Sequence, residues 1–272
     1  MHPRISVNGI CFMDSSLRQQ AIAWDNLGAH RVSLVGPHLD SEGLAEAQRA
    51  LATGKYSLET IVHPFMPGRR LDPDRDSWKG PRSRLSSQIG VARELGAKSI
   101  YMTTGGCGSL TWEQAAETFA NAIAPCVAQA RDEGIALMVE NTPPQYADLH
   151  IAHSLRDTVT LAEIAGIGVC IDLFSCWTEA GLKSTIERAA PRCHLVQVSD
   201  YVCGDRALPA RAVPGDGDMP LERLLQWILG SGYLGAFDLE LLGPRIDAEG
   251  HLEATRRAAM ATGKQLEALG AW

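Results

Sequence analysis

The sequence lacks several features that mark particular classes of protein. Nowhere in its 272 residues do eighteen apolar residues follow one another, so no membrane span is expected. No long apolar segment follows the opening Met1-His2-Pro3-Arg4, which argues against a signal peptide. The seven cysteines form no C-x-x-C motif, a pattern that fits reduced thiols better than a disulfide framework or a zinc knuckle. We therefore expect a cytoplasmic protein.

Runs of basic residues and linker-like segments are missing as well. The net charge is −7, and Lys and Arg are scattered among acids, which argues against a non-specific nucleic-acid surface. No Ser/Gly-rich stretch or change of composition divides the chain. With 45% hydrophobic residues it is long enough to bury a full core, so we expect one domain over 1–272. A homo-oligomer is compatible with this composition.

Eight short apolar runs alternate with stretches of helical periodicity. The predicted strands are Ile5–Met13, Arg31–Gly36, Leu58–Phe65, Ser99–Thr104, Ala136–Glu140, Gly168–Asp172, His194–Gln197 and Ala236–Glu240. Predicted helices include 15–27, 41–52, 111–133, 155–165, 179–190 and 252–269. A polar loop over 66–81 leaves the end of the third strand, and we interpret it as a lid, an idle surface loop being the alternative.

Eight strand-then-helix units in about 250 residues predict a single-domain (β/α)8 TIM barrel. An open, doubly wound sheet is the alternative architecture. It is disfavoured because no G-x-G-x-x-G follows the first strand, and because polar strand ends occur on all of the last four strands.

The last four predicted strands each finish in an oxygen-bearing side chain. These are Glu140, Asp172, Gln197 and Glu240. In a parallel barrel the C-terminal strand ends meet at one face, where three carboxylates need a compensating positive charge. Carboxylate and amide oxygens suit a hard cation, so we expect one divalent ion, Mn²⁺ or Mg²⁺. Any one of these residues alone is better explained as a polar strand end bonded to a nearby loop; the set of four favours a metal site.

The settings of these residues, M-V-E-N, C-I-D-L-F, V-Q-V-S-D and L-E-L-L-G, resemble the sugar phosphate isomerase/epimerase superfamily of xylose isomerase-like TIM barrels. The resemblance covers essentially the whole chain. It implies that Glu140, Asp172, Gln197 and Glu240 bind one divalent metal, and that Glu140 and Glu240 act as catalytic acid and base. The implied chemistry is removal of a proton beside a carbonyl of a small keto substrate, leaving an enediolate.

The chain departs from the named subgroups of that superfamily in three respects. Gln197 stands where the ketose 3-epimerases have His, a choice that resembles the 3-dehydroshikimate and keto-inositol dehydratases. Ser175 and Cys203 replace a His and an Arg of the epimerases, and Thr142 and Leu173 replace two His of the dehydroshikimate dehydratases. The resemblance therefore implies an isomerase or epimerase first and a dehydratase as the alternative.

Four further residues are candidates for substrate binding. His63 ends the third strand, His153 follows Glu140 by thirteen residues, and Arg206 and Arg211 lie in the loop after the seventh strand. Three of them have a structural alternative: His63 packed under the lid, His153 capping the next helix, and Arg211 paired with Asp200 or Asp216.

Two other classes of function were weighed against this one. A nuclease acting on abasic DNA would need several more His ligands and a basic face, and the sequence offers neither. A binding barrel without a metal is the second rival, and the intact Glu140, Asp172 and Glu240 argue against it.

Overall fold

The structure is a computed structural model that describes residues 1–54 and 56–272. Its eight strands follow one another as β1-β2-β3-β4-β5-β6-β7-β8 around a closed barrel, which confirms the predicted (β/α)8 fold. The strands are β1 (Ile5–Asn8), β2 (Arg31–Val35), β3 (Ser57–Pro64), β4 (Ser99–Thr103), β5 (Ala136–Glu140), β6 (Gly168–Asp172), β7 (Cys193–Val198) and β8 (Phe237–Leu239).

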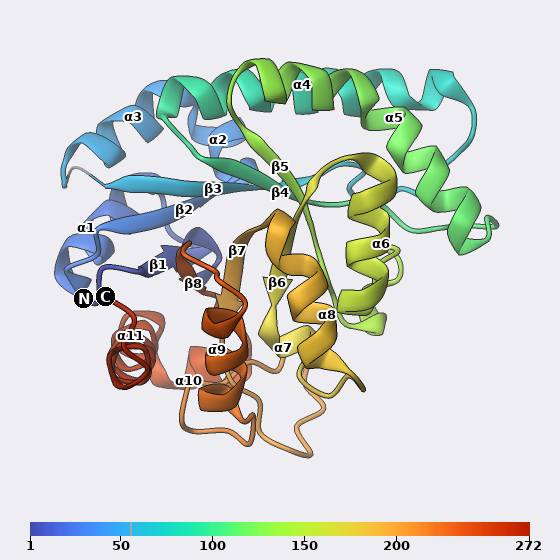
Figure 1. The fold of residues 1–272 in the computed structure, drawn as a ribbon. Helices are drawn as coiled ribbons and strands as arrows, with labels where there is room; N and C mark the ends of the chain where they lie inside the picture. Colours follow the sequence, from blue (N-terminus) through green and yellow to red (C-terminus); the bar gives the residue numbers. More distant parts are fainter. Residues whose placement is uncertain (55) are drawn as a thin grey trace. The chain divides into compact units, whose positions relative to one another are not determined.

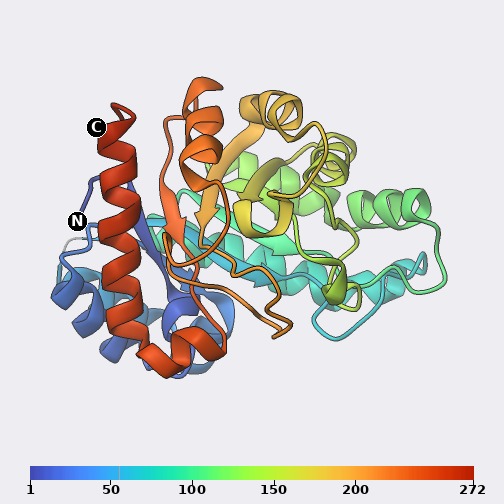
Figure 2. The ribbon, with the colours of Figure 1, turned by 90° about the horizontal axis from the view of Figure 1, so that it is seen from below.

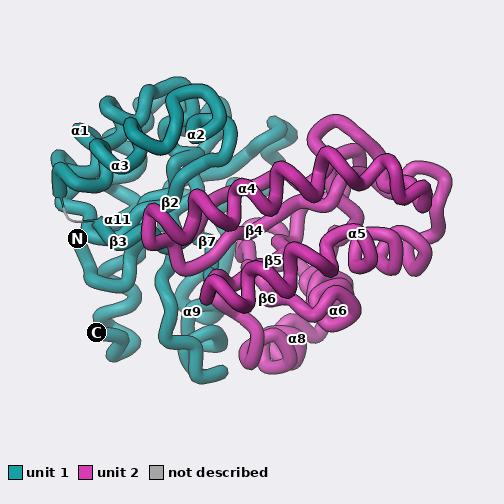
Figure 3. Tube along the Cα trace, turned by 90° about the horizontal axis from the view of Figure 1, so that it is seen from above, with its two compact units in different colours: residues 1–59, 195–272 teal, residues 60–194 magenta. Residues whose placement is uncertain are grey.

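The chain divides into two compact units, which Figure 3 shows in different colours. One unit combines Met1–Glu59 with Leu195–Trp272, and the other is the continuous segment Thr60–His194. The expected extent of a single domain over 1–272 stays a prediction. Each unit is described by itself below.

In the first unit the strand order is β7-β8-β1-β2, and Val7 in β1 lies opposite Leu239 on one side and Val32 on the other. The helices of this unit are α1 (Leu17–Leu27), α2 (Gly36–Glu42), α3 (Leu44–Ala52), α9 (Leu221–Gly230), α10 (Pro244–Glu249) and α11 (His251–Ala268). Helix α11 packs against α1 and β1 (Figure 2). The His2 ring nitrogen Nε2 lies 2.8 Å from the Ala271 carbonyl oxygen, so the two ends of the chain meet (Figure 1).

In the second unit the order is β3-β4-β5-β6, and Ile100 in β4 lies opposite Ile61 and Leu137. Its helices are α4 (Lys79–Leu95), α5 (Trp112–Asp132), α6 (Leu155–Ala165), α7 (Leu173–Cys176) and α8 (Leu182–Ala189). Helix α4 packs on α5, α5 on α6 and α6 on α8, as Figure 1 shows. The apolar strand residues face these helices and the barrel interior, and both layers are buried.

Capping residues fix several helix ends at the predicted places. Ser16 caps α1 and Thr111 caps α5, each in a capping box completed by a glutamine three residues later. Helix α6 ends at Gly166, whose φ of 69° is the left-handed conformation that glycine adopts without strain.

Several predicted boundaries differ from the structure. The helix predicted over 41–52 is interrupted at Gly43, where α2 ends and α3 begins. The first strand stops at Asn8 because the Asn8 side chain accepts the Ile10 N–H, and a 3-10 helix covers Gly9–Phe12. The helix predicted over 179–190 starts only at Leu182. The predicted lid contains a 3-10 turn at Arg75–Trp78 and ends where α4 begins at Lys79; its role as a lid stays a prediction.

Among residues 1–54 and 56–272, no helix has the length and hydropathy needed to cross a bilayer.

Candidate metal and active site

All four predicted ligand residues are buried and lie at or near the C-terminal ends of their strands. Glu140 is the last residue of β5 and Asp172 the last of β6, both in the second unit. Gln197 is the penultimate residue of β7, and Glu240 directly follows β8, both in the first unit. None of the four is more than 7% exposed, so each carboxylate needs partners that offset its lost hydration.

In the second unit, Asn141 ties the ends of β5 and β6 together. Its amide nitrogen donates to the Asp172 carbonyl at 2.8 Å, and its amide oxygen accepts the Asp172 backbone N–H at 2.9 Å. This reciprocal pair fixes the backbone of Asp172 relative to Asn141, and therefore relative to the adjacent Glu140. The sequence pattern placed Asn141 directly after the strand and did not predict this role.

The Asp172 carboxylate accepts two further hydrogen bonds from the turn that follows it. The Phe174 backbone N–H donates to Oδ1 at 3.1 Å, which makes Asp172 the N-cap of α7, and the Ser175 hydroxyl donates to Oδ2. Ser175, which replaces an epimerase histidine, therefore orients a predicted metal ligand.

His150 lies directly beneath Glu140 and is fully buried. Its Nδ1 accepts the Thr104 backbone N–H at 3.0 Å, so Nε2 carries the proton and donates to the Glu140 carbonyl at 2.7 Å. Burial, the largest cause, lowers the His150 pKa to about 3. His150 is thus a neutral link between the ends of β4 and β5.

Of the two predicted substrate-binding histidines in this unit, His153 is only partly buried. Its Nδ1 lies 3.3 Å from both the hydroxyl and the carbonyl oxygen of Thr142, and the cap of α6 is Ser154 instead. His63, in β3, is 6% exposed, and its Nε2 has no hydrogen-bond partner in the described part of the chain. Burial and then nearby Arg84 lower the His63 pKa to about 4.

In the first unit, Glu240 is held by two side chains. Arg211 Nη2 lies 2.9 Å from Glu240 Oε1, with both side chains buried, and the Gln197 amide nitrogen donates to Oε2. Arg211 also donates to the Ser199 hydroxyl at 3.0 Å. The structure thus brings Gln197, Glu240 and Arg211 together, and the acidic partner of Arg211 is Glu240 rather than either expected aspartate.

The two aspartates considered as partners of Arg211 have other roles. Asp200 accepts the backbone N–H groups of four residues in and near the loop after β7: Tyr201, Gly215, Gly217 and Met219. Asp216 pairs with Arg257 instead. The predicted substrate-binding Arg206 is an exposed residue of this same loop.

Sequence reasoning missed the buried carboxylate of Asp238, in the middle of β8. It accepts hydrogen bonds from Asn8 Nδ2 at 2.7 Å and from the Ser33 hydroxyl at 2.8 Å. Burial, opposed by these bonds, raises its pKa to about 7. The available signal was its position: in a strand of alternating side-chain direction, Asp238 faces the same way as Glu240.

The cysteines are free thiols, as their spacing predicts. Burial raises the pKa of Cys11 to about 12 and that of Cys176 well above its usual value. Both therefore stay protonated and unreactive near neutral pH.

A hard divalent cation suits the chemistry of the four predicted donors, three carboxylates and one amide. Across residues 1–54 and 56–272, no group of three or more His, Cys, Asp and Glu side chains has the spacing of a metal site, so the assignment of Glu140, Asp172, Gln197 and Glu240 as ligands stays a prediction. In the first unit, the positive charge beside Glu240 is that of Arg211.

Comparison with known proteins shows which class the barrel belongs to. The chain belongs to the family of xylose isomerase-like TIM barrels, whose model matches residues 21–264. A search of curated protein sequences gives no match.

Three solved structures with the same fold are distant from this chain in sequence. The IolI protein with a binding zinc atom is 13% identical, with a TM-score of 0.82 over 98% of this chain and 99% of that one. D-psicose 3-epimerase with D-fructose is 16% identical, with a TM-score of 0.77 over 98% and 99%. The probable 3-DHS dehydratase AsbF of Bacillus anthracis is 14% identical, with a TM-score of 0.73 over 94% and 98%. At such identities the likeness establishes the fold.

Proposed function

We propose that this chain is a divalent-metal-dependent isomerase or epimerase that removes the proton beside the carbonyl of a keto-sugar or related cyclic keto-polyol. The observation that carries the proposal is the coincidence of the family match with Glu140, Asp172, Gln197 and Glu240 at successive strand ends. Relatives of the same fold include an epimerase and a zinc-binding protein, which supports both the reaction class and the metal.

We assign Glu140, Asp172, Gln197 and Glu240 as the ligands of one Mn²⁺ or Mg²⁺ ion. Such an ion supplies positive charge beside the carbonyl and hydroxyl oxygens of the substrate, which makes the neighbouring C–H more acidic. The orientation of Asp172 by Ser175 and Asn141 supports its assignment, because ligating carboxylates usually have such hydrogen-bond partners.

Glu140 and Glu240 are assigned the proton transfers. One carboxylate removes the proton beside the carbonyl, and the other returns it to the opposite face or to the adjacent carbon. The ion pair with Arg211 holds the Glu240 carboxylate in place, which supports assigning it one of the two proton transfers. Arg211, Arg206, His63 and His153 are the assigned substrate-binding residues.

A metal-dependent dehydratase of the 3-dehydroshikimate or keto-inositol type is the second candidate. Gln197 favours it, since an amide at the third ligand position resembles those enzymes, and the AsbF structure has the same fold. The two reactions begin with the same proton abstraction and differ in whether a β-hydroxyl group then leaves.

Hydrogen exchange with solvent tests the proposal and separates the two reactions. The protein is incubated in D₂O with Mn²⁺ and, in turn, with ketoses, keto-inositols and dehydroshikimate-like acids. Deuterium uptake without loss of water identifies an isomerase or epimerase, and loss of water identifies a dehydratase. Neither signal on any substrate, together with no Mn²⁺ binding by calorimetry, would refute the proposal.

Matched variants test the residue assignments. Glu140→Gln and Glu240→Gln should each abolish exchange, whereas Glu113→Gln, an exposed carboxylate in the first turn of α5, should leave it unchanged. Full activity in both site variants would show that the catalytic assignment is wrong. Mn²⁺ affinity, measured separately, should fall in both site variants and stay constant in the control.

A further inference from the structure

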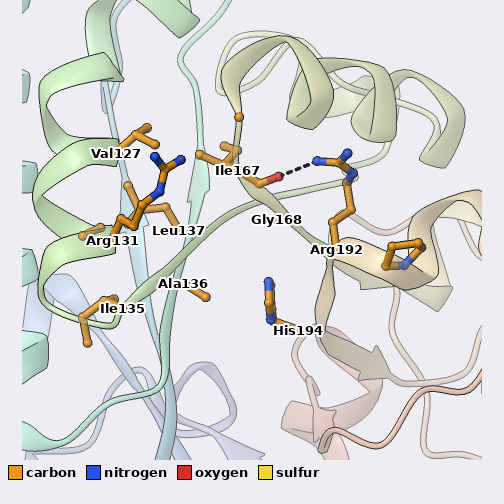
Figure 4. A pocket seen from close by; sticks show the side chains of 12 residues that line it. Val127, Arg131, Ile135, Ala136, Leu137, Ile167, Gly168, Arg192 and His194 are labelled. Carbon is orange, nitrogen blue, oxygen red and sulfur yellow. Dashed lines mark hydrogen bonds between the residues drawn. The ribbon is translucent and has the colours of Figure 1, made fainter.

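A pocket of about 290 Å³ lies at the N-terminal ends of β5 and β6, within the second unit. Its apolar wall is formed by Val127, Ala130, Ile135, Leu137, Ile167 and Pro191. Its polar side chains are Arg131, Arg192 and His194 (Figure 4). Glu140 and Asp172 stand at the opposite ends of these same two strands, so the pocket is distinct from their site.

The charge of this pocket is of one sign. Every titratable side chain among its described lining residues is a base, although the whole chain carries a net charge of −7. In the parts of the chain that the structure describes, neither Arg131 nor Arg192 forms an ion pair with a carboxylate. Glu163, whose pKa Arg192 helps to lower, accepts its hydrogen bonds chiefly from Arg188. The two guanidinium groups therefore retain donors for an external anion.

The backbone holds these cations around the pocket. Arg192 Nη1 donates to the Ile167 carbonyl at 3.3 Å, which anchors that side chain on one side, while Arg131 comes from the last turn of α5 on another (Figure 4). Gly168 leaves room for the histidine: a Cβ atom there would lie 2.5 Å from His194 Cδ2 and 2.9 Å from the Arg192 carbonyl. Only glycine allows the imidazole to approach the start of β6 so closely.

We propose that this pocket binds a small organic anion, with the negative group between Arg131 and Arg192 and an apolar part against Leu137 and Ile167. Guanidinium groups match the geometry of carboxylates and phosphates, and each can supply two parallel N–H donors. A volume near the lower limit of ligand sites, roughly 300 Å³, restricts the ligand to a small one. The ligand is a monocarboxylate or a phosphomonoester, and it stabilises the starts of β5 and β6.

Calorimetric titration with benzoate, phenyl phosphate and inorganic phosphate tests this assignment. We expect saturable binding of one benzoate or phenyl phosphate per chain, and the better ligand of the two identifies the anionic group. Inorganic phosphate alone should bind more weakly because it makes no apolar contact. The double variant R131Q/R192Q should lose about 10-fold or more in affinity, as expected for the loss of charged hydrogen bonds.

Arg156→Gln is the control, since Arg156 is an exposed arginine of the same unit outside the pocket. This variant should bind benzoate and phenyl phosphate as tightly as the unchanged protein does. The His194 imidazole signals in NMR provide a second measurement, which should shift on adding phenyl phosphate and should not shift in the double variant. The absence of saturable binding by benzoate and phenyl phosphate, or equal affinity in the double variant, would overturn the proposal.

Discussion

Arg211 and Glu240 form a buried ion pair, with Nη2 and Oε1 2.9 Å apart and neither side chain more than 7% exposed. Removing one member of such a pair leaves the other charge uncompensated. We therefore expect Arg211→Gln to lower the free energy of unfolding by about 3–5 kcal/mol in metal-free buffer. Urea denaturation followed by circular dichroism measures this loss.

The same variant distinguishes a metal ligand from a carboxylate held only by arginine. If Glu240 binds Mn²⁺, added Mn²⁺ should restore part of the lost stability, because the ion replaces the missing positive charge. Lys79→Gln, which removes a pair with Asp76 that is more than 70% exposed on both sides, should cost less than about 1 kcal/mol. Equal stability of Arg211→Gln with and without Mn²⁺ would count against Glu240 as a ligand.

Asn141→Ala should weaken both the fold and the metal site. The variant leaves the buried backbone N–H and carbonyl of Asp172 without the partners that Asn141 provides, at a cost of about 1–3 kcal/mol for each group. Mn²⁺ affinity should fall as Asp172 loses its fixed position. Asn121→Ala, at an exposed position in α5, is the control and should change neither quantity. Unchanged Mn²⁺ affinity in Asn141→Ala would count against Asp172 as a metal ligand.

His63 should make the protein sensitive to mild acid. Its pKa is about 4 in the folded chain and 6.5 in the unfolded chain, so the unfolded chain binds the proton first as the pH falls. The neutral ring's contribution is fully present above pH 6.5 and is lost progressively down to about pH 4. Between pH 7 and pH 5 the expected loss from His63 is about 2 kcal/mol.

His63→Gln should therefore show a smaller loss of unfolding free energy over that interval than the unchanged protein. His150, whose pKa is lowered to about 3, acts in the same direction and keeps part of the acid sensitivity in the variant. His30→Gln, at an exposed histidine, is the control. Identical pH profiles for His63→Gln and the unchanged protein would contradict the assignment of a buried, neutral His63.

Asp200→Ala should loosen the loop after β7, because four backbone N–H groups converge on this one carboxylate. Limited proteolysis should cut the variant within 201–218 at least several-fold faster than the unchanged protein. If Arg206 and Arg211 bind substrate, KM should rise more than kcat falls. Asp216→Asn, an exposed change in the same loop, should leave the cleavage rate and KM nearly unchanged.

The fold was largely predictable because its signals are local. Apolar runs such as Ala136–Glu140 are buried on both faces of a parallel sheet, and caps such as Thr111 and Ser16 act within one helical turn. The errors occurred where a side chain redirects the backbone. Asn8 ends the first strand by accepting the Ile10 N–H, a choice that apolar periodicity does not reveal.

The candidate site was predictable only as far as residue type and strand position allow. The predicted strand ends identified four candidate residues, Glu140, Asp172, Gln197 and Glu240. The hydrogen-bond partners of those residues depend on contacts distant in sequence. Asp172 meets Asn141 across 31 positions, and Glu240 meets Gln197 across 43. Such pairs follow from the closed arrangement of the strands rather than from any local pattern.

The composition of the first unit, from 1–59 and 195–272, has a consequence for how the protein is made. On the ribosome β1 is synthesised before the segment 60–194, whereas its neighbour β8 is synthesised after that segment. The segment 60–194 is continuous, so it can begin to fold before β8 has been synthesised and can pair with β1. We expect the nascent chain to order the segment 60–194 before β1 pairs with β8.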